Sequence, residues 1–161
     1  MSADQIPVIP PVRHKSKRRL TRDFILQALY RRLLSGADAR ELQRDIEASE
    51  YWVKLDHEFY RSTLAGVIAD IDGLEAGLAP ALDRPLHELS PIERAVLQIG
   101  IFELIHRPET PLRVVINEAI ELAKTFGGTD GHKFVNGVLD RLAQTLRAGE
   151  AAKAGRHGAG I

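Results

Sequence analysis

The 161-residue sequence predicts an all-α fold, a compact bundle of helices in one domain or in two tightly joined subdomains. Three observations lead to this prediction. Apolar residues recur at three- and four-residue spacing in several segments, and serine, aspartate, proline and glycine bound those segments as helix starts and stops. No segment shows the alternation of a half-buried strand. We therefore expect about six to seven helices and no sheet.

The composition excludes several classes of protein. At 44% hydrophobic and 27% charged residues, it is that of an ordinary globular domain. There is no cysteine, which excludes disulfides, thiolate metal sites and cysteine nucleophiles. No apolar run approaches the roughly 20 residues of a membrane span, and no apolar segment of signal-peptide type follows the basic N-terminus. We expect a cytoplasmic protein.

The net charge is zero, but the charge is unevenly distributed along the chain. Residues 1–37 carry eight Lys and Arg against two acidic residues. Residues 38–93 carry five against thirteen, and residues 94–161 carry nine against seven. Such a separation can attract a polyanion at one end and a basic partner elsewhere.

A basic arm leads into the first predicted helix. Residues 1–16 are proline-rich and lack periodicity, so we expect a disordered tail. Six of the ten residues from Arg13 to Arg22 are Lys or Arg. A helix is predicted next, because apolar residues recur at helical spacing at Leu26, Leu29, Tyr30 and Leu33. Gly36 should end this helix. Arg18 and Arg22 lie one turn apart and could hold phosphates, although a solvated tail or a membrane-surface patch gives the same pattern.

The sequence of the middle of the chain predicts two further helices followed by a connector. A short acidic helix is expected from Asp38 to about Ala48, and a longer one from about Trp52 to Ala79. Pro80 and Pro85 then break the chain into a connector that ends at Leu89. We interpret Trp52 as a packing residue rather than a platform for bases.

Ser90 opens a well-defined helix. Serine at the N-cap, proline at N1 and Glu93 at N3 form a capping box. The helix that follows is apolar around much of its circumference, so it should be buried within the bundle. Glu93 has two roles open to it, the reciprocal cap on Ser90 or contact with a basic partner.

The stretch from Val114 to Leu142 predicts two helices joined by a tight polar turn. Thr110–Pro111 repeats the N-cap and N1-proline arrangement at the start of the first helix. Gly127 and Gly128 should end that helix in the left-handed conformation. Asp130 should cap the next helix. A polar loop between rigid elements is a common place for binding.

Several side chains around this turn have two interpretations. Asn117 and Asn136 are most simply hydrogen-bond ties between helices. Phe126 and Phe134 fill a core by default, but they could stack on unpaired bases. Asp130 is a cap first, and its charge would weaken phosphate binding. Lys133 is the cation of the turn suited to phosphate.

No pattern of catalytic residues stands out. The histidines at His57 and His87 lack the second histidine of a zinc-protease helix. The glycines around Gly127 fail the phosphate-loop pattern, since His132 stands where its second glycine would fall. We therefore expect no enzymatic activity, no metal site and no cofactor. After Arg147 the chain is rich in glycine and small residues, so residues 148–161 are expected to be a disordered tail.

Two segments resemble a known family. ERAVLQIGIFELIHRPETPLRVVINEAIELAKTFGGTDGHKFVNGVLDRL resembles the C-terminal half of the NusB transcription antitermination factors, and RRLTRDFILQALY resembles their arginine-rich first helix. VINEAIELAK and HKFVNGVLD are the most specific parts. The resemblance covers residues 17–147.

The resemblance implies two helical subdomains, residues 17–80 and 81–147, and a non-enzymatic role. Members of this family bind the boxA element of leader RNA, especially of ribosomal RNA, jointly with the ribosomal protein NusE. With the other Nus factors they help RNA polymerase to resist termination. Members differ between monomer and homodimer. The alternative is a helical protein–protein adaptor that does not bind RNA.

The resemblance also implies site residues. The arginine-rich helix and the turn between the last two helices would hold RNA through Arg18, Arg19, Arg22, Phe126, Asp130, Lys133 and Phe134. The ribosomal partner would dock on an acidic surface that includes Glu93, with Tyr30 nearby. Residues 38–93, with their excess of acids, fit such a basic partner.

Two positions depart from the family pattern. Leu20 interrupts an arginine run that some members continue, and Gly131 replaces a small polar residue. The same helical module also begins some ribosomal-RNA cytosine methyltransferases. A chain that ends at Ile161 leaves no room for their catalytic domain, so we expect the free-standing factor.

Overall fold

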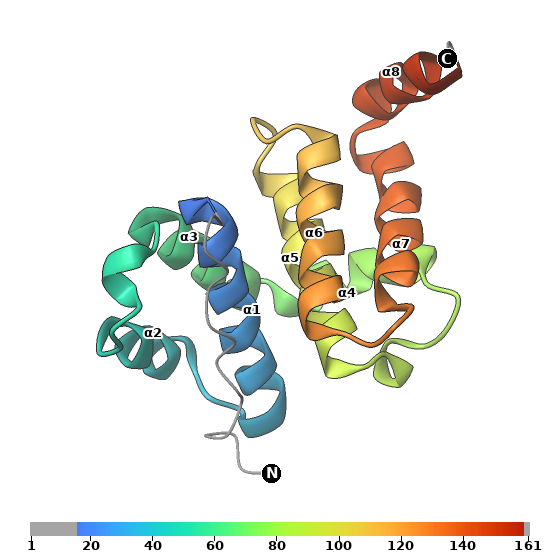
Figure 1. Cartoon of the computed structure of the whole chain (residues 1–161). Helices are drawn as coiled ribbons and strands as arrows, with labels where there is room; N and C mark the ends of the chain where they lie inside the picture. The colour runs from blue at the N-terminus through green and yellow to red at the C-terminus, as the bar shows by residue number, and fades with distance from the viewer. Residues whose placement is uncertain (1–15, 160–161) are drawn as a thin grey trace. The chain divides into compact units, whose positions relative to one another are not determined.

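The computed structural model describes the backbone of residues 16–159 and the side chains of residues 16–153. Nearly all of the predicted N-terminal tail lies outside the described residues. Residues 16–159 form eight α-helices and three short 3₁₀ turns, without a strand (Figure 1). The all-α prediction is confirmed.

The chain divides into two compact units, Met1–Asp70 and Ile71–Ile161. The boundary expected from the sequence lies later, between residues 80 and 81. The reason for the difference is helix α4 (Ile71–Leu78), which packs on α5 (Pro91–His106) in the second unit. Its Gly77 lies so close to α5 that a Cβ there would be 3.0 Å from the Ile101 side chain.

The first unit consists of α1 (Lys17–Ser35), α2 (Ala39–Glu47), the 3₁₀ turn η2 (Trp52–Lys54) and α3 (His57–Ala69). Helix α3 packs against both α1 and α2. Gly36 closes α1 in the left-handed conformation (φ 73°), as predicted. The buried apolar residues of the unit include Phe24, Ile25, Leu26, Leu29, Leu42, Phe59, Tyr60, Leu64 and Val67.

The predicted long helix from Trp52 to Ala79 is wrong, because this stretch is broken twice. Asp56 interrupts it first, since its carboxylate accepts the Phe59 N–H (3.1 Å) and starts α3 there. Asp70 interrupts it again with non-helical dihedral angles (φ −131°, ψ 40°). An apolar period carried across two short helices resembles one long helix when the sequence alone is considered.

The second unit is built around α5, whose residues 95–104 are all buried. The prediction of a buried helix in the middle of the bundle is confirmed. Helices α6 (Leu112–Phe126) and α7 (Gly131–Leu146) pack on α5 and on each other, and Figure 1 shows the three side by side. The 3₁₀ turns η3 (Ala79–Ala81) and η4 (Leu86–Glu88) lie in the connector before α5.

The region after Arg147 differs from the expected disordered tail, because Ala148–Ala159 form helix α8 against α7. Arg147 is buried, and its guanidinium donates to the backbone carbonyls of Glu103, Leu104, Arg107 and Thr110. The Glu150 carboxylate accepts from Arg147 (3.2 Å) and from the Leu112 N–H (2.9 Å). These contacts fasten the start of α8 to the α5–α6 connection.

The expected Thr110–Pro111 cap is also corrected. Pro111, not Thr110, stands at the N-cap of α6, and it makes no side-chain cap. Thr110 is buried, and its carbonyl accepts from Arg147. The carboxylate of Glu150 takes the place of a local cap on the α6 N-terminus, which favours negative charge.

Candidate RNA and partner surfaces

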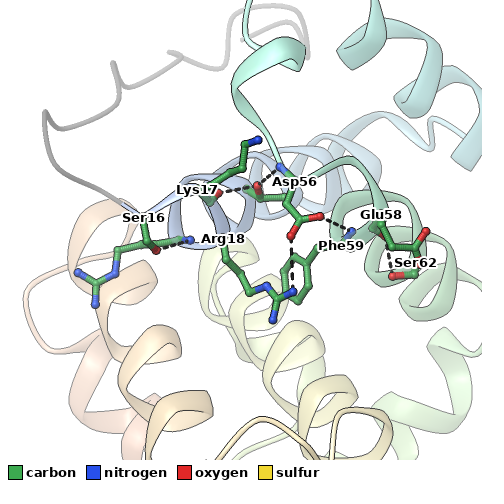
Figure 2. A network of polar contacts seen from close by, with 9 residues as sticks. Ser16, Lys17, Arg18, Asp56, Glu58, Phe59 and Ser62 are labelled. Carbon is green, nitrogen blue, oxygen red and sulfur yellow. Dashed lines mark hydrogen bonds and ion pairs between the residues drawn. The ribbon is translucent and has the colours of Figure 1, made fainter.

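Arg18 lies at the start of α1, where the sequence predicts phosphate contacts. Ser16 caps the helix by accepting the Arg19 N–H (3.1 Å). The Arg18 guanidinium donates to the Asp56 carboxylate (3.5 Å) and lies 4.6 Å from the centre of the Phe59 ring (Figure 2). Its side chain remains half exposed. Arg18 is therefore a positioned cation that solvent, and hence a ligand, can reach.

Asp56 ties the start of α3 to the first turns of α1. Its N–H donates to the Thr21 hydroxyl (2.9 Å), which donates in turn to the Lys17 carbonyl (2.7 Å). Its carboxylate both caps α3 and accepts from Arg18 (Figure 2). The arginine-rich turn of α1 is thus held by packing and hydrogen bonds from a segment 35 or more residues away.

The other two α1 arginines predicted to contact RNA, Arg19 and Arg22, differ from Arg18 in exposure. Arg22 is only 3% exposed, and its guanidinium lies 5.0 Å from the Phe59 ring, which it shares with Arg18. The predicted one-turn juxtaposition is therefore present, but a direct phosphate contact would require Arg22 to leave its buried position. Arg19 is partly exposed. Tyr30, further along α1, is also partly exposed.

The turn between α6 and α7 differs in detail from its prediction. Gly127 is extended (φ −96°, ψ −177°), not left-handed. A Cβ at this position would lie 2.7 Å from the Ala123 carbonyl oxygen, so a close approach of backbone explains the glycine. Gly128 is not left-handed either. Phe126 ends α6 and is partly exposed.

Asp130 occupies the N-cap position of α7, but its side chain caps nothing. The predicted cap is wrong because the carboxylate faces Lys133 instead, at 3.3 Å. Both side chains are largely exposed, at 76% and 73%. The pair leaves a carboxylate and an ammonium group on the surface of the turn, where each is available to a ligand.

Phe134 has a neighbour that no local sequence pattern indicates. The Arg84 guanidinium, from the connector before α5, lies 4.4 Å from the centre of the Phe134 ring. Phe134 is partly exposed. In the sequence, Arg84 stands out only as the single Lys or Arg of an acidic connector that contains two prolines. No local pattern relates it to a ring 50 positions later.

Glu93 forms the predicted capping box with Ser90, with reciprocal hydrogen bonds of 3.1 Å. Its carboxylate also lies next to the turn, since a Cβ on Gly131 would be 3.3 Å from the Glu93 Oε1. A side chain at position 131 would thus press on Glu93. The residue expected to face the protein partner therefore adjoins the turn expected to hold RNA.

The predicted asparagine ties are not formed. Asn117 is exposed on α6, and Asn136 is partly exposed on α7. The described residues include no hydrogen bond from either side chain to another helix. Helix periodicity misleads here, because neither asparagine belongs to the buried residues of its helix.

The predicted RNA residues fall into two groups. Arg18, Arg19 and Arg22 belong to the first unit, as does Tyr30. The turn residues from Phe126 to Phe134 belong to the second unit together with Glu93. Within the groups, Arg18 and Arg22 share the Phe59 ring, and Glu93 lies beside Gly131 of the turn. A surface that joins both groups stays a prediction.

Comparison with known proteins decides the family. The sequence profile described as the NusB family matches residues 19–144. The chain belongs to the NusB family. It is 51% identical over 142 residues to the transcription antitermination protein NusB of Paraburkholderia phymatum, covering 88% of this chain and 98% of the relative. It is 53% identical over 136 residues to that of Burkholderia cenocepacia, covering 84% and 94%.

The fold agrees with a solved NusB structure. NusB of T. maritima superposes with a TM-score of 0.68 at 30% identity, covering 82% of this chain and 94% of that one. The NusB match includes every predicted RNA and partner residue except Arg18, which precedes it by one position. Arg147, Glu150 and α8 follow the matched region.

The described part of this NusB-family chain contains neither a candidate metal site nor a candidate membrane-spanning helix. Its His, Asp and Glu side chains form no group of three that could hold a metal ion. None of its helices combines the length and apolar character that crossing a membrane requires.

Proposed function

We propose that this chain is a transcription antitermination factor that binds boxA-type leader RNA together with the ribosomal protein NusE, and so helps RNA polymerase to resist termination. Membership of the NusB family over residues 19–144 is the observation that carries the proposal. In this proposal the chain acts by binding, without a catalytic step and without a cofactor.

The RNA surface of the proposal has two parts, each argued from its own unit. In the first, Arg18 and Arg19 are accessible cations at the start of α1. In the second, Lys133 supplies an exposed ammonium group beside the partly exposed ring of Phe134. Cations for phosphate and rings for unpaired bases are the combination that single-stranded RNA requires.

The partner surface of the proposal is acidic. Residues 38–93 carry thirteen acidic residues against five basic ones, and Glu93 lies beside the turn. Ribosomal proteins are basic, so the charges are complementary. Because Glu93 adjoins the proposed RNA residues, a partner bound there would be close enough to share the RNA.

Titration of a boxA-type single-stranded RNA, with and without NusE, tests the proposal. We expect weak, salt-sensitive binding by the chain alone, tightened by about tenfold or more when NusE is present, because two linked contacts raise affinity. A scrambled RNA of the same composition is the control. Equal affinity for both RNAs in both conditions would exclude the proposed function.

The competing function is a protein adaptor whose basic helix is only solvated. Replacing Arg18 and Arg19 by alanine separates the two, and Arg22 is kept because it is buried. The matched control is Arg40→Ala with Arg44→Ala, two exposed arginines of α2. The adaptor predicts that both double variants assemble on RNA equally well. The RNA-binding factor predicts that only the α1 variant fails.

Self-association is a further way to hide an RNA surface, as members of the family differ between monomer and homodimer. Sedimentation of the chain with and without boxA-type RNA distinguishes this case. A dimer that RNA dissociates would mean that the dimer interface and the RNA surface overlap. A mass that rises by one RNA per chain would mean that they do not.

A further inference from the structure

Arg84 has a fixed position beside the turn although it lies outside every helix. The Arg141 guanidinium on α7 donates to the Ala81 carbonyl (2.9 Å), which fastens the connector to α7 just before Arg84. Leu89, at the other end of the connector, is buried. Between these two anchors the Arg84 guanidinium lies 4.4 Å from the centre of the Phe134 ring.

This position is accessible and strongly charged. The Arg84 side chain is 42% exposed and donates to the Asp83 carboxylate (2.9 Å). That hydrogen bond raises the pKa of Arg84, and the nearby carboxylates of Glu93 and Glu88 act in the same direction. Arg84 therefore carries its charge throughout the physiological pH range.

The contact with Phe134 does not by itself explain Arg84 as a stabilising residue. An exposed cation–π contact adds only slightly to the stability of a fold. An ion pair between neighbouring exposed residues contributes about as little. Both contacts are weak enough for a ligand to displace or extend them.

We propose that Arg84 is a further RNA-binding residue, which together with Phe134 holds one nucleotide of the single-stranded RNA. The inference rests on the proposed function and adds a residue from the connector before α5 to that surface. A guanidinium on an aromatic ring offers both a plane for an unpaired base and donors for a phosphate.

The charge of Arg84 favours RNA over the protein partner as its ligand. The carboxylates of Glu93 and Glu88 lie close enough to influence Arg84, and they suit a basic protein. A cation among them would repel such a protein, but it would attract a phosphate. Arg84 thus lies where RNA would pass beside the partner surface.

The test uses the full chain and a boxA-type single-stranded RNA oligonucleotide. Arg84→Ala should weaken RNA binding about fivefold to tenfold, as expected for loss of a stacking contact. It should also reduce the salt slope of log K by about 0.7, the value for one phosphate contact with a single strand. Arg84→Lys should restore the slope but only part of the affinity, because lysine has no planar group.

Arg113→Ala is the matched control. Arg113 is an exposed arginine in the first turn of α6, about 20 Å along that helix from Phe126. Its removal changes the net charge equally and should leave RNA affinity unchanged. Thermal unfolding of each variant checks that the fold is intact.

A double-variant cycle tests the pairing with Phe134. Phe134→Leu should weaken binding, and adding Arg84→Ala should cost less than it does in the native chain, because the two residues hold the same nucleotide. Fully additive losses would overturn the shared site.

The outcomes separate this inference from the proposed function. If the native chain binds boxA-type RNA and Arg84→Ala binds it as tightly as Arg113→Ala does, Arg84 is not an RNA residue. If Arg84→Ala weakens NusE binding in the absence of RNA and leaves RNA binding unchanged, Arg84 belongs to the protein surface, and the inference also fails. If the native chain binds no RNA, the proposed function falls and the inference falls with it.

Discussion

At the scale of single residues, accessibility distinguishes the arginines that were predicted together. Arg18 and Arg22 share the ring of Phe59, yet Arg18 is half exposed and Arg22 is buried. Sequence spacing correctly predicted that they lie one turn apart. Only the packing of Phe59 from α3 decides which of them can reach a phosphate.

Asp130 lies on the turn without a capping role, so its charge can be tested cleanly. Asp130→Asn removes a negative charge and releases Lys133 from its exposed ion pair. We expect RNA affinity to rise about twofold to fivefold at low salt, since exposed pairs of this kind contribute about 0–1 kcal/mol. Filter binding of boxA-type RNA measures the change.

The control for this substitution is Asp140→Asn. Asp140 is an exposed residue of the same helix, about 15 Å further along it. It should leave RNA affinity unchanged. An equal rise in both variants would mean that net charge alone, and not the turn, sets the affinity.

At the scale of elements, Gly127 determines how α6 ends. Gly127→Ala places a Cβ 2.7 Å from the Ala123 carbonyl, so we expect a loss of about 1–3 kcal/mol in the free energy of unfolding. Gly128→Ala meets nothing within 4 Å and should change stability by less than about 1 kcal/mol. Urea unfolding compares the two. Equal stability would show that the turn yields to the new methyl group.

Arg147 fastens α8 to the connection between α5 and α6. Its side chain is 5% exposed and donates to four backbone carbonyls and to Glu150. We expect Arg147→Met to lower the free energy of unfolding by about 3 kcal/mol or more, because buried carbonyls lose their donors. Lys153→Met, an exposed change on α8, is the control. If both substitutions lowered the free energy of unfolding by a similarly small amount, Arg147 would not be what fastens α8 to the connection between α5 and α6.

At the scale of the whole molecule, the chain separates a basic N-terminal part from an acidic middle part, and the proposed function assigns the first to RNA and the second to a protein partner. We expect a plot of log K, where K is the RNA association constant, against log salt concentration to have a slope of about −2 to −3. That slope corresponds to three or four cations in contact with phosphates of a single strand. Arg18, Arg19, Lys133 and Arg84 are the cations we propose. Isothermal titration over a range of salt concentrations measures the slope. A slope near zero would contradict an electrostatic surface.

The sequence by itself determined the all-α fold, the starts and ends of several helices, and the family. Capping residues and apolar spacing are local signals, so Ser90, Gly36 and the buried α5 were predicted correctly. The same signals failed where two short helices continued one apolar period across Asp70. They also failed at Asp130, because a cap-forming residue type does not oblige the side chain to cap.

Only the tertiary structure decided which side chains face outward and which meet across the chain. Arg84 meets Phe134, and Arg147 meets the carbonyls at the end of α5, although long stretches of sequence separate these partners. Such contacts depend on how helices pack, and packing is cooperative over the whole unit rather than encoded in any local spacing. The helix periodicity could therefore predict a polar turn and an arginine-rich helix, while packing alone placed Arg84 beside that turn and buried Arg22.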